Sequence, residues 1–86
     1  MSIVLPDCVN HTNAMALQNQ GSDQLQKSQT IDCGALKDFD SSVLAVLMAW
    51  QRRLAISNQK IMVLNPPNKL KVLASVYGVS ELLGLN

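Results

Sequence analysis

The residues that stand out for chemistry are Asp40-Ser41-Ser42, which directly precede a strongly helical, apolar segment. Asp and Ser are common at a helix start because their side chains accept hydrogen bonds from the free backbone N–H groups of the first turn. A hydroxyl at this position is also exposed. A phosphate on it would lie beside the helix N-terminus, which favours negative charge, while the neighbouring Asp40 would oppose it. The pattern predicts a capped helix start. The functional alternative is a site at which modification of Ser41 changes the character of the surface.

Other reactive side chains are few and scattered. His11 is the only histidine, and a catalytic base would need a partner that the sequence does not identify, so a capping or surface role is favoured. Cys8 and Cys33 with His11 do not supply the four closely spaced ligands of a structural zinc site, and we interpret both cysteines as reduced core residues. Asp38 and Asp40 fit helix capping better than an acid–base pair. Because no glycine-rich phosphate-binding motif is present either, we expect no enzymatic activity, no metal and no cofactor.

Composition narrows the function classes further. The 86 residues suffice for one domain, and 48% hydrophobic with only 15% charged residues favours a subunit whose surface is partly covered by a partner. A net charge of +1 does not supply the positive field that nucleic-acid binding requires. The longest apolar run, 43–50, is far shorter than the roughly 20 residues of a membrane span, and no signal segment is evident. We therefore expect an intracellular protein that binds no nucleic acid and has no membrane span.

Hydrophobic periodicity predicts the order strand, helix, strand, helix, strand, helix, which indicates an α/β fold with a mostly parallel sheet. We expect strands over 2–5, 30–36 and 60–64, and helices over 10–20, from Asp40 to Leu54, and over 69–77. Gly21 is expected to end the first helix, and the polar stretch from there to residue 29 is expected to be an irregular loop or a frayed continuation of the helix. Leu47 is expected to be buried against the sheet. For the last helix we expect Asn68 as the cap, Gly78 as the stop, inward-facing side chains at Leu70, Leu73 and Val76 or Tyr77, and a tail over 79–85 that packs back on the body.

Residues 30–55, TIDCGALKDFDSSVLAVLMAWQRRLA, resemble the centre of a STAS domain. In that family a hydrophobic strand and a turn lead to Asp-Ser-Ser-Gly, or a variant of it, at the start of a long apolar helix. The resemblance continues through 60–64 as the next strand. Residues 68–83 are similar to the final helix of the Mla-type STAS subunits, and 5–14 resemble their first strand-to-helix segment, so nearly the whole chain is covered.

The resemblance implies a single STAS domain over 1–86, with a mostly parallel sheet of about four strands and helices packed against it. Mla-type subunits are small cytoplasmic partners of an ABC ATPase that moves phospholipids between the two membranes of Gram-negative bacteria. It therefore implies a non-enzymatic accessory subunit that binds and regulates such an ATPase, cytoplasmic and held near the inner membrane by its partner. The alternative implied by the same family is an anti-sigma factor antagonist, which an anti-sigma factor kinase would phosphorylate on Ser41.

The resemblance also implies where a partner would bind. By its place after Asp40, Ser41 matches the phosphorylatable serine of the antagonists and the threonine of the transport-type subunits, which puts Phe39, Asp40 and Ser42 in the partner interface. Val43 stands where the antagonists mostly have glycine, and we expect it to narrow the approach of a kinase. The family also carries a further strand before this opening, so we expect a sheet edge that a partner, or a second copy in a homodimer, can cover.

Overall fold

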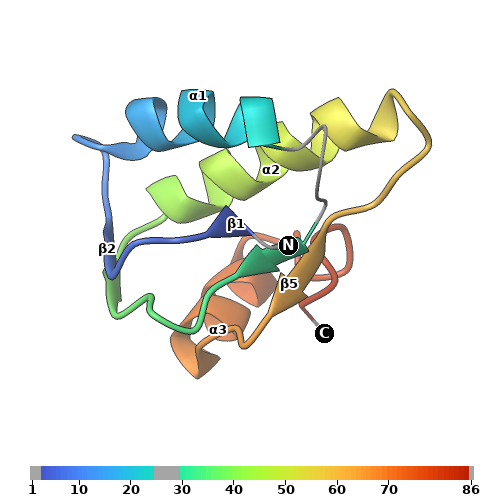
Figure 1. The fold of residues 1–86 in the computed structure, drawn as a ribbon. Coiled ribbons are helices and arrows are strands. Elements are labelled where there is room, and N and C mark those ends of the chain that lie inside the picture. The colour runs from blue at the N-terminus through green and yellow to red at the C-terminus, as the bar shows by residue number, and fades with distance from the viewer. Residues whose placement is uncertain (1–2, 25–29, 86) are drawn as a thin grey trace.

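The computed structural model describes residues 3–24 and 30–85, which form five short strands and three helices (Figure 1). The strands are β1 (Ile3–Val4), β2 (Cys8–Val9), β3 (Thr30–Asp32), β4 (Asp38–Phe39) and β5 (Met62–Leu64). The helices are α1 (Ala14–Gln24), α2 (Ser42–Ala55) and α3 (Asn68–Val76). The predicted α/β class is confirmed. None of these helices in the described part of the chain is long and apolar enough to cross a bilayer.

The strands form two small parallel sheets rather than one sheet of about four strands. The first has the order β1-β3-β5, with Ile3 opposite Ile31 and Ile31 opposite Val63, and the second pairs β2 with β4. The run predicted as one strand over 30–36 is split because the chain turns after Asp32. The Asp32 carboxylate accepts a hydrogen bond from the Gly34 backbone N–H at 2.8 Å, which fixes the turn. The strand count is therefore five among the described residues.

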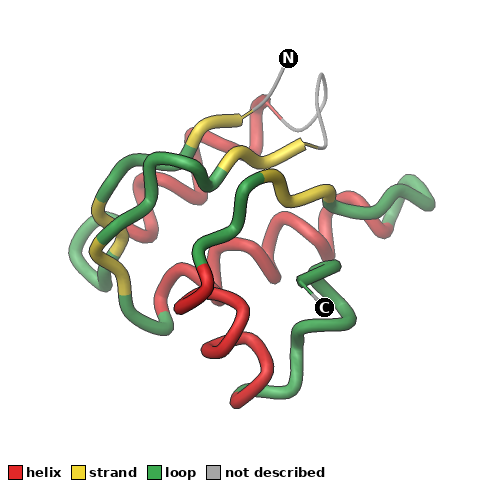
Figure 2. Tube along the Cα trace, turned by 90° about the horizontal axis from the view of Figure 1, so that it is seen from below, coloured by secondary structure: helices red, strands yellow, loops and turns green. Residues whose placement is uncertain are grey.

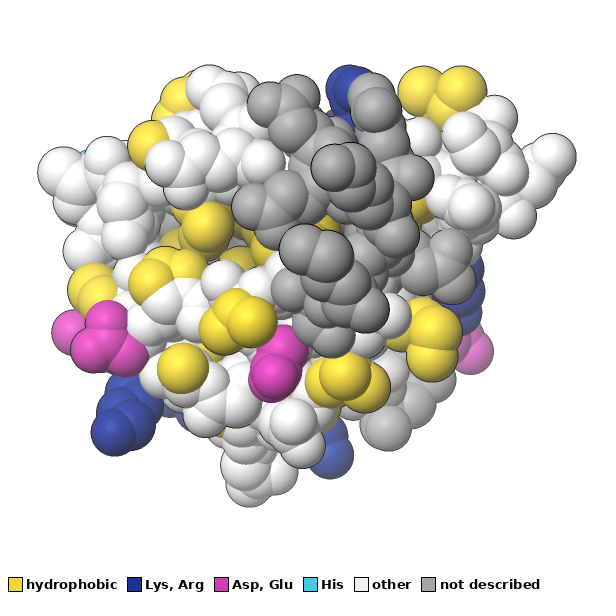
Figure 3. All heavy atoms as spheres, viewed as in Figure 1, with side chains coloured by type: hydrophobic (Ala, Val, Ile, Leu, Met, Phe, Trp, Pro, Cys, Tyr) yellow, Lys and Arg dark blue, Asp and Glu magenta, His cyan; other side chains and the backbone are white. Residues whose placement is uncertain are grey.

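The three-stranded sheet has one buried and one open face. Ile3 and Ile31 point to the interior, whereas their neighbours Val4 and Met62 are exposed on the other face. This is the alternation that a half-buried sheet requires. Figure 2 shows the strands along one side of the molecule with α2 and α3 on the other side of them. Figure 3 shows several hydrophobic side chains exposed on the viewed face, with polar and acidic side chains beside them.

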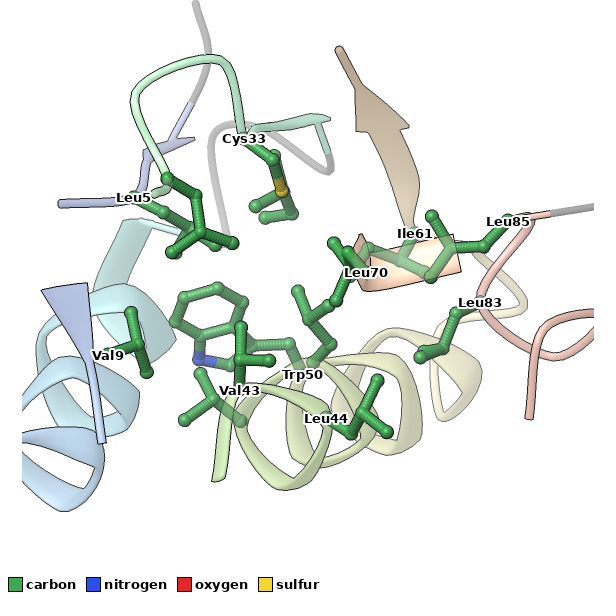
Figure 4. Packing of buried hydrophobic residues seen from close by; sticks show 14 of the residues in the cluster. Leu5, Val9, Cys33, Val43, Leu44, Trp50, Ile61, Leu70, Leu83 and Leu85 are labelled. Carbon is green, nitrogen blue, oxygen red and sulfur yellow. The ribbon is translucent and has the colours of Figure 1, made fainter. Parts of the chain in front are cut away.

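The core lies between the strands and α2. Trp50 and Leu47 of α2 are completely buried, so the predicted burial of Leu47 is confirmed. Figure 4 shows side chains from the strands, from α2 and from the tail pointing into the same interior. Leu83 and Leu85 are buried there, which confirms that the tail packs back on the body.

The prediction that Gly21 ends the first helix is wrong. Helix α1 continues through Gly21 to Gln24, and the rest of the predicted polar loop, 25–29, lies outside the described residues. A Cβ atom at Gly21 would lie only 2.1 Å from Cζ2 of Trp50, so the glycine lets the backbone of α1 rest on the indole ring. The indole N–H also donates a hydrogen bond to the Gln18 carbonyl oxygen at 3.1 Å. Gly21 is therefore a contact residue between α1 and α2, not a helix stop.

Helix α3 also differs in detail from its prediction. Pro67 occupies the N-cap position, and Asn68 is the first helical residue, so Asn68 is not the cap. Leu70 is buried as predicted and Leu73 is partly buried, but Val76 and Tyr77 are exposed and Ala74 is buried in their place. Gly78 has a φ of +72°, the left-handed conformation that commonly ends a helix, so the predicted stop is confirmed.

Candidate functional site

The candidate site is the corner where β4 leads into α2, and its backbone is held by the β2–β4 pair. The N–H groups of Lys37 and Asp38 both donate to the Asp7 carbonyl oxygen, at 2.8 and 2.9 Å. The Asp40 N–H donates to the Val9 carbonyl oxygen at 3.3 Å. These long-range bonds fix the path of the chain on both sides of β4. The corner is thus a part of the folded scaffold, not a free loop.

Asp40 organises the start of α2. Its carboxylate accepts a hydrogen bond from the backbone N–H of Ser42, the first helical residue, at 2.8 Å, as predicted, but Ser41 rather than Asp40 occupies the N-cap position. Hydrogen bonds from the backbone and the side chain of Ser42 lower the pKa of Asp40 from its usual value, and the charge of nearby His11 lowers it a little further. The carboxyl group is fully exposed and therefore ionised at neutral pH. A negative charge thus stands permanently beside Ser41.

Ser41 itself is exposed and makes no side-chain capping bond. Its backbone carbonyl oxygen accepts from Leu44 N–H at 3.1 Å, so the residue is tied into the first turn. Its φ of −63° and ψ of −12° are already helical. The hydroxyl is therefore on the surface, at the positive end of the α2 dipole, and has no hydrogen bond to any described residue.

Phe39 is buried, unlike the rest of the corner, with only 5% of its surface exposed. Its ring faces the core on one side, and the ammonium group of Lys69 lies 5.2 Å from the ring centroid. This is within the range of a cation–π contact. Phe39 therefore packs beneath the exposed residues of the corner, on the core side, and offers almost no surface to a partner. The exposed parts of the corner are Asp40, Ser41 and Lys69.

Val43 is also buried, with its side chain in the core. The expectation that it narrows the approach of a kinase is therefore wrong, because the side chain points away from the surface that such a partner would touch. The second residue of a helix that packs on a sheet can face inward, and the sequence pattern alone does not show which way it turns.

The loop before α1 lies against the corner and was not expected to be part of it. Asn13 donates from its side-chain amide to the Cys8 carbonyl oxygen at 2.8 Å and accepts from the Asn10 N–H at 2.8 Å. The Asn10 side-chain oxygen in turn accepts from the Thr12 N–H at 2.9 Å, within the turn that precedes α1. These bonds order the loop and place exposed His11 near Asp40. The two asparagines, three residues apart directly after a strand, were the available signal.

The exposed side chains of the corner are thus the carboxylate of Asp40, the hydroxyl of Ser41 and the ammonium group of Lys69. The backbone that carries Asp40 and Ser41 is fixed by hydrogen bonds. In the view of Figure 3, acidic side chains with basic ones beside them gather at the end of the molecule where β2 and β4 lie. Over residues 3–24 and 30–85, no three His, Cys, Asp or Glu side chains come together as metal ligands would. The arrangement can accept and donate hydrogen bonds to another surface, or accept a modification on Ser41.

Fold and site together define a class, a small parallel α/β domain with an exposed serine at a strand-to-helix corner. A family model described as "Mlab, STAS domain" matches residues 3–84. The chain belongs to this STAS family, as the resemblance of residues 30–55 predicted. Comparison with curated proteins gave no match, and comparison with solved structures gave none either.

Proposed function

We propose that this chain is the non-catalytic STAS subunit of an Mla-type phospholipid transporter, a cytoplasmic protein that binds and regulates the ABC ATPase through the Ser41 corner. The observation that carries the proposal is the exposed Ser41 hydroxyl on a fixed backbone, at the position that the family uses for partner contact. The match to the Mlab type of STAS domain favours the transport role.

The chemistry of the corner suits a docking surface. Ser41 is neutral, Asp40 next to it is acidic, and the exposed Lys69 contacts the Phe39 ring, so a partner of the corner can form hydrogen bonds and an ion pair of either sign. The backbone on both sides is held by hydrogen bonds to Asp7 and Val9, which limits the entropy lost on binding.

The second candidate is an anti-sigma factor antagonist regulated by phosphorylation of Ser41. The burial of Val43 favours it more than the sequence did, because the exposed hydroxyl remains open to a kinase. A phosphate on Ser41 would be stabilised by the α2 N-terminus and repelled by Asp40.

The test is affinity purification of the tagged full chain from native membranes and cytosol, with mass spectrometry of the bound proteins and of Ser41. Recovery of an ABC ATPase with unmodified Ser41 supports the proposal. Recovery of a serine kinase and a phosphorylated Ser41 supports the antagonist, and absence of an ATPase overturns the transport role.

Two variants then test the corner. Ser41→Asp should fold, because the helix start tolerates the charge, but burial of that charge in an interface should weaken binding by several kcal/mol. Ser41→Ala loses at most one hydrogen bond, about 0.5–1.5 kcal/mol. Ser75→Asp, which places the same charge on the exposed surface of α3, is the matched control and should bind like the wild type. Normal binding by Ser41→Asp would show that the interface lies elsewhere.

A further inference from the structure

The loop that follows α2 holds an isoleucine in solvent. Ile56 is 85% exposed, more than any other large apolar side chain that the structure describes. A single exposed apolar residue is ordinary on a protein surface. What sets Ile56 apart is the rigidity of its loop and the charge around it.

Backbone hydrogen bonds make the loop a fixed feature. The N–H groups of Ser57 and Gln59 both donate to the Leu54 carbonyl oxygen, at 3.0 and 2.9 Å. Asn58, with a φ of 59°, takes the left-handed conformation that reverses the chain between them. Two residues later the Ile61 N–H donates to the buried side-chain oxygen of Gln51 at 2.8 Å, which ties the returning strand to α2. The chain therefore doubles back tightly over the last turn of the helix.

Three cations lie close to Ile56 along the chain. Arg52 and Arg53 lie four and three residues before it, the spacing at which side chains share a helix face, and both are exposed in the last turn of α2. Lys60 is exposed and directly precedes Ile61, the residue tied to α2. None of the three cations forms an ion pair with a described acidic residue. We call Arg52, Arg53, Ile56 and Lys60 the basic tip.

The basic tip also protrudes. In both Figure 1 and Figure 2 the loop after α2 extends beyond the body of the molecule, at the end opposite β2 and β4. Figure 3 shows an acidic side chain beside a basic one at this end. Cations in the last turn also suit the dipole of α2, which accounts for the two arginines. The dipole does not account for a rigidly presented Ile56 or for Lys60.

We propose that the basic tip contacts the surface of an anionic lipid bilayer, with the cations at the headgroups and Ile56 inserted at the boundary of the acyl chains. Exposed cations next to an exposed apolar side chain match the layered chemistry of that surface. A nucleic acid would interact favourably with the cations but not with Ile56. The bilayer is therefore the better fit. The inference goes beyond the proposed function and does not depend on it, since it concerns the opposite end of α2 from Ser41.

Three cations and one isoleucine give weak binding by themselves. Each cation near an anionic surface contributes a roughly fivefold increase in partitioning, so the tip acts as an orienting contact for a chain already near a membrane. The test therefore uses the full chain with vesicles of phosphatidylglycerol alone, at low salt and high lipid concentration, read by co-sedimentation. Vesicles of phosphatidylcholine serve as the uncharged reference.

We expect binding to phosphatidylglycerol and not to phosphatidylcholine, with loss of binding as salt is raised. The double variant Arg52→Gln, Arg53→Gln should lower partitioning by about 25-fold, and Ile56→Ser should lower it by several-fold. The matched controls are Lys71→Gln and Val76→Ser on α3, both at exposed positions, and they should bind like the wild type.

Equal binding by Ile56→Ser, by the arginine variant and by the controls would overturn the proposal, as would no sedimentation of the wild type. A tip variant that binds no ATPase yet sediments normally with vesicles would also overturn it, and would assign the basic tip to a protein partner. Loss of vesicle binding with ATPase binding intact separates this surface from the Ser41 corner.

Discussion

The contact between Gly21 and Trp50 gives the sharpest test of the fold. In the structure a Cβ atom at Gly21 would lie 2.1, 2.6 and 3.0 Å from Cζ2, Cε2 and Cη2 of Trp50. Ordinary carbon contacts are about 3.5–4.0 Å, so α1 or the indole must move by more than 1 Å to admit one methyl group. The indole has little freedom, because it is fully buried and its N–H is bonded to the Gln18 carbonyl oxygen.

The expected change in the free energy of unfolding on Gly21→Ala is the sum of two opposed effects. Overpacking of a filled core costs about 1–3 kcal/mol, and this overlap involves a rigid ring, so we take the upper value. Alanine in a helix is favoured over glycine by about 1 kcal/mol. Gly21→Ala should therefore destabilise the protein by about 2 kcal/mol, which is about 10 °C in Tm for a domain of this size. Urea unfolding and a thermal melt measure both quantities.

A double-mutant cycle tests whether the overlap with Trp50 causes this destabilisation. Trp50→Leu removes the three ring atoms that the new methyl group would meet, so in that background Gly21→Ala should be neutral or stabilising by up to about 1 kcal/mol. Ala16→Gly, at an exposed position of α1, controls for helix propensity alone and should cost about 1 kcal/mol in either background. If Gly21→Ala raises the Tm of the otherwise unchanged protein, then α1 does not pack on Trp50 as described.

Two further predictions concern the core. Leu47→Ala should lower the free energy of unfolding by about 2–5 kcal/mol in a urea titration, because the side chain is completely buried; an unchanged midpoint would mean that α2 packs through another face. Burial, and to a lesser degree the charge of Asp32, raises the pKa of the Cys33 thiol from 9.0 to about 12. The unfolded chain loses this proton near pH 9 and the folded chain does not, so stability should fall as pH rises from 9 toward 12. In Cys33→Ala this part of the pH dependence should disappear, and an identical profile would contradict the assignment.

Helix α2 was predictable because its burial follows from the period of its apolar residues. Val43, Leu47, Trp50 and Leu54 recur every three or four positions and all are buried. The order of strands and helices follows in the same way from the alternation of apolar segments. The Asp-Ser pair before α2 predicted the capping bond because that bond joins residues two apart in the chain.

Gly21 shows why other features could not be predicted. A glycine after a helical pattern is most often a stop. Here the reason for the glycine lies 29 positions away, in the ring of Trp50, and the sequence does not show that contact. Val76 and Tyr77 illustrate the same limit, since they continue the periodic pattern of α3 but lie beyond the part of the helix that the core covers.

In the candidate site, too, the features set by neighbouring residues could be predicted from the sequence, and those set by distant residues could not. The position of Asp40 and Ser41 at a helix start could be predicted from adjacent residues. The family resemblance added the expectation that a partner binds there. The roles of Phe39 and Lys69 could not, because a ring in the core and a cation on α3 meet only after folding. The consequence for the interface is specific. Phe39 offers a partner almost no surface, whereas Lys69 over its ring is exposed, so we expect charge at position 69 to affect binding and loss of the ring to affect stability first.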